Sequence, residues 1–172
     1  MISSASVGAA LRPVQNSDLV TILTWRNDER IRLHMFNSNI IKPEQHYSWF
    51  DRVRDNPDVE LLMLEVGGVA QGFMNLKIEP RSRIATWGFY VSPLAPQGAG
   101  SLLGRLTLRH CFLKRSVHKI VGEVLEHNTR SIKFHLRNRF LEEGRLRLHH
   151  FDGERYHDVL TFGLLSTEWN DE

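Results

Sequence analysis

The segment with the clearest chemical signal is a glycine-containing loop between a predicted strand and a predicted helix. Residues 89–104 read FYVSPLAPQGAGSLLG, so a strand pattern ends near Val91, Gly98-Ala99-Gly100 follow, and helical spacing begins at once. Glycines let a ligand approach the backbone, and the free N–H groups and dipole at a helix start favour an anion. This arrangement is typical of a site for a pyrophosphate group.

Two common phosphate-binding motifs do not fit this loop. A P-loop needs a Gly-Lys-Ser/Thr ending, which the loop lacks. A dinucleotide fingerprint needs an early strand–helix–strand unit and a third glycine, whereas this loop follows three consecutive strand patterns. A Gly-x-Gly before a helix is a weak signal alone, so the interpretation depends on the elements around it.

Those elements form a regular series of strands and helices. An edge strand is expected at residues 10–14, a helix with Ser17 as its N-cap comes next, and a second helix starts near Pro43. Further strands are expected at 59–66, 69–78, 83–92 and 119–126, helices at 98–115 and 129–140, and terminal strands at 145–151 and 156–165. The strand after the helical crossover should lie parallel to its predecessor, so we predict one α/β domain over residues 1–172.

Composition and charge restrict the class of protein. The 172 residues carry a formal net charge of +2, with 41% hydrophobic and 24% charged residues. These values are ordinary for a globular domain and do not favour nucleic-acid binding. The single cysteine, Cys111, excludes an intramolecular disulfide. Because we find neither a signal-peptide pattern nor a run of about 20 apolar residues, we expect a cytoplasmic protein that does not contact the membrane.

Two segments together resemble motifs of the GNAT acetyltransferase superfamily. Residues 89–104 are similar to motif A, in which the fourth strand leads through a pyrophosphate loop into the third helix. The run EVLEHN at 123–128, followed by Ser131-Ile132 and Arg139-Phe140, is similar to motif B. The order and spacing of the two motifs support membership of this superfamily.

The resemblance implies a mixed central sheet whose parallel fourth and fifth strands are splayed and flanked by helices. It also implies acyl-CoA N-acyltransferase activity, with acetyl-CoA as cosubstrate and no metal. The expected cosubstrate-binding residues are Phe89, Val91, Gln97, Gly98, Ala99, Gly100, Ser101, Asn128 and Ser131. Two positions depart from the family pattern: Ala95 stands where the loop usually opens with Arg or Gln, and Arg139 replaces a Gly. Neither change removes the backbone amides of the loop.

Direct transfer to an amine needs groups that accept and donate protons. Many relatives place a Tyr seven residues after the motif B Asn, and that position is His135 in this sequence. An imidazolium can donate a proton to the departing thiolate. Glu126 is the expected base, directly or through water, and Glu79 is a weaker candidate. If both His135 and Glu126 were misplaced, the chain would be a non-catalytic acyl-CoA sensor.

A metal site is not expected from the histidines near the C-terminus. His149, His150 and His157 are the nearest approach to a ligand set, but alternating strand faces separate the first two. No cysteine or carboxylate pattern completes the set.

The N-terminal half, which determines the acceptor in this superfamily, carries aromatic and basic residues. The run WRN at 25–27, the later Met35 and the pattern His-x-x-Trp-Phe at 46–50 resemble the sugar-nucleotide branch of the superfamily. Residues 143–169 are similar to that branch as well. The implied acceptor is the 4-amino group of a UDP-linked amino-deoxysugar.

A nucleotide-linked deoxysugar offers a diphosphate for arginine and a methyl group for an apolar pocket. The expected acceptor-binding residues are Arg26, Arg30, Met35, Phe36, Phe50 and Tyr90. The alternative is an N-terminal protein acetyltransferase of the ribosomal-protein type, for which an acidic, extended groove would be expected instead. The terminal strands leave a homodimer possible.

Overall fold

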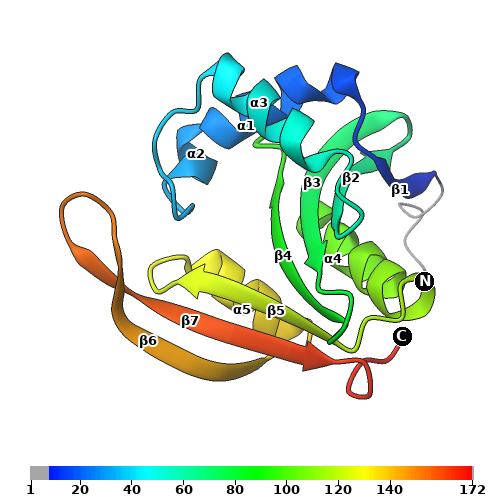
Figure 1. Cartoon of the computed structure of the whole chain (residues 1–172), viewed down its shortest axis with the longest axis vertical. Helices are drawn as coiled ribbons and strands as arrows, with labels where there is room; N and C mark the ends of the chain where they lie inside the picture. The colour runs from blue at the N-terminus through cyan, green and yellow to red at the C-terminus, as the bar shows by residue number, and fades with distance from the viewer. Residues whose placement is uncertain (1–7, 172) are drawn as a thin grey trace.

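Seven strands form one mixed sheet in the order β1-β2-β3-β4-β5-β7-β6 in the computed structural model, which describes residues 8–171 (Figure 1). The strands are β1 (Ala9–Pro13), β2 (Val59–Val66), β3 (Val69–Ile78), β4 (Ile84–Val91), β5 (Lys119–Leu125), β6 (Leu141–Phe151) and β7 (Tyr156–Leu165). The helices are η2 (Asn16–Asp18), α1 (Leu19–Asn27), α2 (Glu29–Arg32), α3 (Pro43–Val53), α4 (Ala99–Arg109), η3 (His110–Lys114) and α5 (Thr129–Arg137). The pair β4–β5 is parallel, and the other neighbouring pairs are antiparallel. The predicted α/β fold class, with parallel strands four and five, is confirmed.

The strand β2 shows how alternation divides the interior into two cores. Leu62 and Leu64 belong to the larger core, which also contains residues of α4 and the end of α5. Leu61 and Met63, on the opposite face of the same strand, belong to a second core beneath α1 and α3. Helices therefore cover both faces of the sheet, with α1 to α3 on one face and α4 on the other. Within residues 8–171, each helix is too short or too polar to cross a bilayer.

Tight turns join the strands of the meander as the glycine pattern predicts. Gly67 and Gly68 have φ values of 58° and 80°, and they connect Val66 directly to its partner Val69. The terminal hairpin is also present. Asp152 accepts hydrogen bonds from two backbone N–H groups of its turn, and Gly153 has a φ of 104°.

The central feature of the sheet is the short pairing of β4 with β5. The two strands pair only between residues 84–86 and 119–121. Beyond Thr86 they diverge, whereas β5 stays paired with β7 from Lys119 to Leu125 (Figure 1). Beyond Thr86 the two strands form an open V. In this part, the backbone N–H and C=O groups of β4 do not pair with those of β5.

Three local expectations were wrong. Ser17 is not an N-cap, because residues 16–18 form a separate 3-10 turn in front of α1 and Asp18 precedes the helix. The helix expected at 98–115 changes to a wider π turn at His110. The helix expected at 129–140 ends at Arg137 because Arg139 adopts a φ of 65°, a left-handed conformation that ends an α-helix.

Candidate active site

The V between β4 and β5 contains a cavity of about 370 Å³, which we call the splay cavity. Its walls are Thr86, Trp87, Gly88 and Phe89 of β4; Val121, Gly122, Glu123, Val124 and Leu125 of β5; Asn128, Ser131 and His135; and His34, Met35 and Phe36. The β4 and β5 segments on its two sides are not paired with each other, so the cavity can accept an extended ligand that hydrogen-bonds to the facing backbone groups. Phe89, Asn128, Ser131 and His135 of the predicted site thus lie together.

The glycine loop at the start of α4 has the predicted geometry for an anion. Gly98 has a φ of 95°, and a Cβ built on it would meet nothing within 4 Å. Within residues 8–171, the backbone N–H groups of Gly100 and Ser101 have no protein acceptor, while Ala99 and Leu102 donate to Pro96 and Gly98. The free amides and the helix dipole together favour a bound phosphate group at this point. Val91 ends β4 beside the loop, since its Cγ1 lies 4.0 Å from a Cβ built on Gly100.

His135 is buried between β4 and β5, and both of its ring nitrogens have partners. Its Nδ1–H donates to the carbonyl of Ser131 at 2.8 Å, and its Nε2 accepts the indole N–H of Trp87 at 3.1 Å. Burial lowers the pKa of His135, which favours the neutral ring. A proton donated from this ring therefore has to come from the hydrogen bond to Ser131. His135 as the acid stays a prediction.

Gly122 makes room for the bond between Trp87 and His135. A Cβ on Gly122 would lie 2.8 Å from Nε1 of Trp87 and closer still to Nε2 of His135. The glycine is therefore required by a close approach of side chains rather than by an unusual backbone angle.

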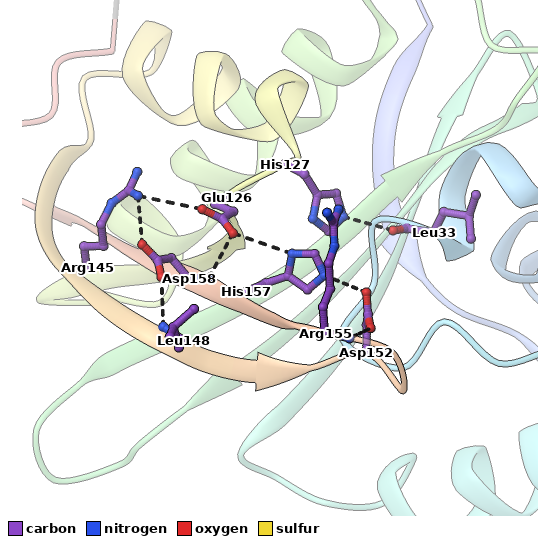
Figure 2. Close-up of polar contacts among 9 residues, drawn as sticks. All are labelled: Leu33, Glu126, His127, Arg145, Leu148, Asp152, Arg155, His157 and Asp158. Atoms are coloured by element: carbon purple, nitrogen blue, oxygen red, sulfur yellow. Dashed lines mark hydrogen bonds and ion pairs between the residues drawn. The ribbon is translucent and has the colours of Figure 1, made fainter.

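Glu126 points toward β7 instead of into the splay cavity (Figure 2). Its Oε1 accepts the backbone N–H of Asp158 at 3.2 Å and lies 3.6 Å from Nδ1 of His157. Its Oε2 lies 3.9 Å from the guanidinium of Arg145. Glu79 is also engaged locally, since its carboxylate accepts the backbone N–H of Ser82 in the turn before β4. Direct removal of a substrate proton by either carboxylate stays a prediction, without support from the cavity walls.

A second cavity of about 410 Å³, the side cavity, adjoins the first on the side of α1 and α3. Met35, Gly88 and Phe89 line both cavities. The remaining residues of the side cavity are Arg26, Asn37, Ile41, Gln45, His46, Trp49, Phe73, Asn75 and Tyr90. The shared residues make the two cavities neighbours, so molecules bound in both could lie next to each other.

Arg26 and His46, which both line the side cavity, each have a buried nitrogen without a partner in the described part of the chain. Nη1 of Arg26 and Nε2 of His46 have no hydrogen-bond partner within residues 8–171, although Nη2 of Arg26 donates to the carbonyl of Asn37. Burial lowers the pKa of the Arg26 guanidinium and raises that of Tyr90 beside it. No Asp or Glu is among the described residues that line the side cavity. The side cavity is thus lined by a half-buried cation and, among the described residues, by no carboxylate.

The predicted acceptor-binding residues divide into two groups. Arg26, Met35 and Tyr90 line the side cavity, and Phe36 lines the splay cavity. Arg30 and Phe50 lie outside both. Arg30 is an exposed side chain that forms an ion pair with Asp28 at 2.7 Å, and Phe50 is buried in the core beneath α1 and α3.

Comparison with known proteins agrees with this arrangement. The family model described as "Acetyltransferase (GNAT) domain" matches residues 9–141. The chain belongs to the GNAT acetyltransferase family. A relative in the curated proteins, an SPbeta prophage-derived uncharacterized N-acetyltransferase of Bacillus subtilis, is 25% identical over 166 residues, covering 92% of this chain and 90% of the relative.

Solved structures of other GNAT acetyltransferases have the same fold. The spermidine N-acetyltransferase from Vibrio cholerae, solved with CoA and spermine, superposes with a TM-score of 0.87 at 21% identity, covering 95% of this chain and 98% of that one. The ribosomal-protein-alanine N-acetyltransferase from Brucella melitensis has a TM-score of 0.75 at 22% identity, covering 91% and 99%. The predicted enzyme class, an acyl-CoA N-acyltransferase, is confirmed by the family.

GNAT acetyltransferases use acetyl-CoA, and the residues of this site fit it. The unpaired amides of Gly100 and Ser101 suit its pyrophosphate, and the open strand segments suit a narrow arm with amide groups. Within the described residues 8–171, no cluster of His, Cys, Asp and Glu is arranged to hold a metal ion.

Several residues of this GNAT site were missed from the sequence. Trp87 and Gly122 have no motif that marks them, and their role follows only from the packing of β4 against α5. His34 precedes the predicted Met35, yet nothing in its local pattern placed it on the splay cavity. His46 is part of the His-x-x-Trp-Phe pattern at 46–50. Its position on the buried face of the amphipathic α3 was the sequence signal that could have identified it.

Proposed function

We propose that this acetyltransferase transfers the acetyl group of acetyl-CoA directly to the 4-amino group of a UDP-linked 4-amino-4,6-dideoxysugar. The sequence resembles the UDP-4-amino-4,6-dideoxy-N-acetyl-beta-L-altrosamine N-acetyltransferases of pseudaminic acid biosynthesis, and this resemblance suggests the acceptor. The observation that carries the proposal is the half-buried Arg26, which lines a cavity without a carboxylate and keeps one guanidinium nitrogen without a partner within residues 8–171.

Partial burial of a guanidinium without a counterion carries a desolvation cost that a bound anion would offset. An anionic acceptor meets this need, and a diphosphate offers oxygens for charge-assisted hydrogen bonds to Arg26. A polyamine would bring further positive charge instead. Two unit charges of equal sign at 4 Å repel by about 4 kcal/mol at an effective dielectric constant of 20.

The shape and polarity of the side cavity also suit a deoxysugar nucleotide. Trp49, Phe73 and Tyr90 supply aromatic surface for a base or for the apolar side of a sugar. Asn75 and Gln45 supply amide groups that can donate to and accept from hydroxyls. The shared wall at Gly88 and Phe89 would place the amine next to the thioester.

For acetyl-CoA, we propose that the amides from Gln97 to Ser101 hold the pyrophosphate. The backbone at Phe89 and Val91 would bind the pantetheine arm and polarise the thioester carbonyl. Asn128 and Ser131 line the same cavity and would contact the arm from α5. Acetyl-CoA supplies the activated acyl group, and the protein contributes position, a polarised carbonyl and proton transfer.

The test is a panel of amines offered with acetyl-CoA, following thiol release and product mass. The panel holds a UDP-4-amino-4,6-dideoxysugar, a peptide with N-terminal alanine, and spermidine. One acetyl group on the UDP-sugar is the expected product. Acetylation of the peptide or of spermidine, with the UDP-sugar unchanged, would overturn the proposal.

Arg26→Met sharpens this test, and Arg109→Met is its matched control. Hydrogen bonds to charged groups contribute about 1.5–3 kcal/mol, so the KM for the UDP-sugar should rise roughly 10- to 150-fold. The KM for acetyl-CoA should stay within twofold, because Arg26 does not line the splay cavity. Arg109 pairs with Asp171 at the end of α4 and lines neither cavity, so its replacement should leave both constants unchanged.

A further inference from the structure

His34 lies at the junction of the two cavities, on the turn that follows α2. It lines the splay cavity, and its neighbour Met35 lines both cavities. Its side chain is exposed. Unlike those of His135, its ring nitrogens have no hydrogen-bond partner within the described residues 8–171. A ring in this position is free to accept a proton from a molecule that spans the two cavities.

His127 holds the backbone next to His34 in place. Its Nε2–H donates to the carbonyl of Leu33 at 3.2 Å, and this bond ties the turn after α2 to the end of β5 (Figure 2). The two imidazole rings are tilted by 34° with centroids 5.7 Å apart. Nδ1 of His127 is buried and has no partner within residues 8–171. This hydrogen bond fixes the tautomer of His127 and leaves Nδ1 as a bare acceptor.

A third histidine extends the series away from the cavity. The ring of His157 lies 5.0 Å from that of His127, measured between centroids. Its two nitrogens face carboxylates, with Nε2 at 2.6 Å from Asp152 and Nδ1 at 3.6 Å from Glu126 (Figure 2). The three rings therefore lead from the site toward negative charge at the β6–β7 hairpin.

We propose that His34 is the general base that removes the first proton from the acceptor's ammonium group, with His127 as its positioning residue. The inference rests on the proposed transfer to an amine. The N–H bond of the ammonium breaks and an N–H bond forms on His34, which becomes an imidazolium. The neutral amine then attacks the thioester carbonyl, and the C–S bond breaks to release thiolate.

Proton balance gives His34 one net proton to discard in each cycle. The tetrahedral intermediate loses a second proton from nitrogen, and the thiolate takes up one to become the thiol of CoA. The overall change converts ammonium and thioester into amide, thiol and one proton. That proton leaves from the exposed ring of His34 to solvent.

The charged surroundings of His34 suit this role at neutral pH. Partial desolvation by the neighbouring residues and the positive charges of His127 and Arg130 all lower the pKa of His34 from its ordinary value, which favours a neutral ring able to accept a proton at pH 7. Glu123 of β5 and His135 of α5 are the other titratable groups on the walls of the same cavity. Activity should therefore fall on the acid side as His34 becomes protonated.

The test is the pH dependence of kcat/KM for His34→Gln, with the panel amine that the wild-type enzyme acetylates. Loss of a general base lowers turnover by roughly 10²-fold or more, so we expect kcat/KM of His34→Gln to fall by about that factor at pH 7. The decrease in kcat/KM at low pH that comes from protonation of His34 should be absent in this variant. Imidazole added to His34→Ala should restore part of the activity. Unchanged kcat/KM and an unchanged acid limb in His34→Gln would overturn the proposal.

Two further variants separate catalysis from structure. Arg130→Gln removes a positive charge that lowers the pKa of His34, so the acid limb should move to higher pH. His127→Gln should lower kcat more than it changes the KM for acetyl-CoA. His118→Gln is the control, because this exposed residue lies at the other end of β5 and should leave the pH profile unchanged.

The outcome is separable from that of the substrate proposal. If the wild-type enzyme acetylates a peptide instead of the UDP-sugar, the acceptor assignment fails, and the His34 variants are then measured on that peptide. If the UDP-sugar is acetylated equally well by His34→Gln, the acceptor assignment stands and the general-base role fails.

Discussion

Replacing His135 by Phe keeps a ring of similar size but removes both ring nitrogens. The indole N–H of Trp87 then loses its acceptor inside a side chain that is only 8% exposed. An unsatisfied buried donor costs about 1–3 kcal/mol. The carbonyl of Ser131 loses one donor as well, but a carbonyl has a second lone pair, so this loss counts less.

We therefore expect His135→Phe to lower the free energy of unfolding by about 2–3 kcal/mol. For a domain of 150–250 residues each 1 kcal/mol shifts Tm by about 2–4 °C, so Tm should fall by roughly 4–12 °C. Thermal unfolding followed by circular dichroism measures this shift. Trp87→Phe provides the second arm of a double-mutant cycle because it removes the donor of the same bond.

In the double variant neither partner is left unsatisfied, so its loss should be smaller than the sum of the single losses by about 1–2 kcal/mol. Losses that add within about 0.5 kcal/mol would refute the reasoning. Turnover of the same variants decides the chemical role. If His135 donates a proton, kcat should fall by roughly 10²-fold in His135→Phe but not in Trp87→Phe. If His135 only positions other groups, kcat should fall by similar factors in both single variants.

Three more predictions follow from individual residues. The pKa of buried His135 lies below its ordinary value, so below about pH 6.5 the unfolded chain binds a proton that the folded chain does not. The free energy of unfolding should therefore fall as the pH drops from 7 to 5, and it should fall less steeply in His135→Phe. Urea unfolding across this pH range measures both trends. Arg139→Gly should raise Tm by a few degrees in a thermal scan, because glycine adopts the observed φ of 65° without the strain of about 1–2 kcal/mol that a side chain brings; an unchanged or lower Tm would contradict this. Gly98→Ala should raise the KM for acetyl-CoA several-fold while leaving the KM of the acceptor unchanged, because alanine is strained at a φ of 95° and shifts the amides that follow; equal effects on both constants would count against an anion site at this loop.

The sequence predicted the sheet and the glycine loop because their signals are local. Gly67-Gly68 and Gly153 mark turns through their positive φ values, and the change of period after Gly98 marks the crossover to α4. The parallel pairing of β4 with β5 then follows from the helix between them. These elements also placed Asn128 and Ser131 beside Phe89.

The parts of the site that depend on side-chain direction were not accessible in this way. Glu126 was expected to end β5 but lies in the turn just after Leu125, and its carboxylate accepts the backbone N–H of Asp158, 32 residues away in sequence. Nothing in the local sequence distinguishes Arg30 from Arg26, yet Arg30 is exposed and pairs with Asp28, whereas Arg26 is half-buried and lines the side cavity. Such outcomes depend on which neighbour lies within reach after folding, and no local pattern records it.

The short pairing of β4 with β5 also divides the molecule mechanically. Within residues 8–171, strand pairing across the middle of the sheet is confined to residues 84–86 and 119–121, so this narrow seam joins the β1–β4 half of the sheet to the β5–β7 half. An extended ligand arm that hydrogen-bonds to both β4 and β5 beyond this short pairing would extend the sheet contact as an additional strand does. The binding free energy of such a ligand would then also stabilise the contact between the two halves of the sheet. Release of the ligand would weaken that contact at the place where the next ligand enters.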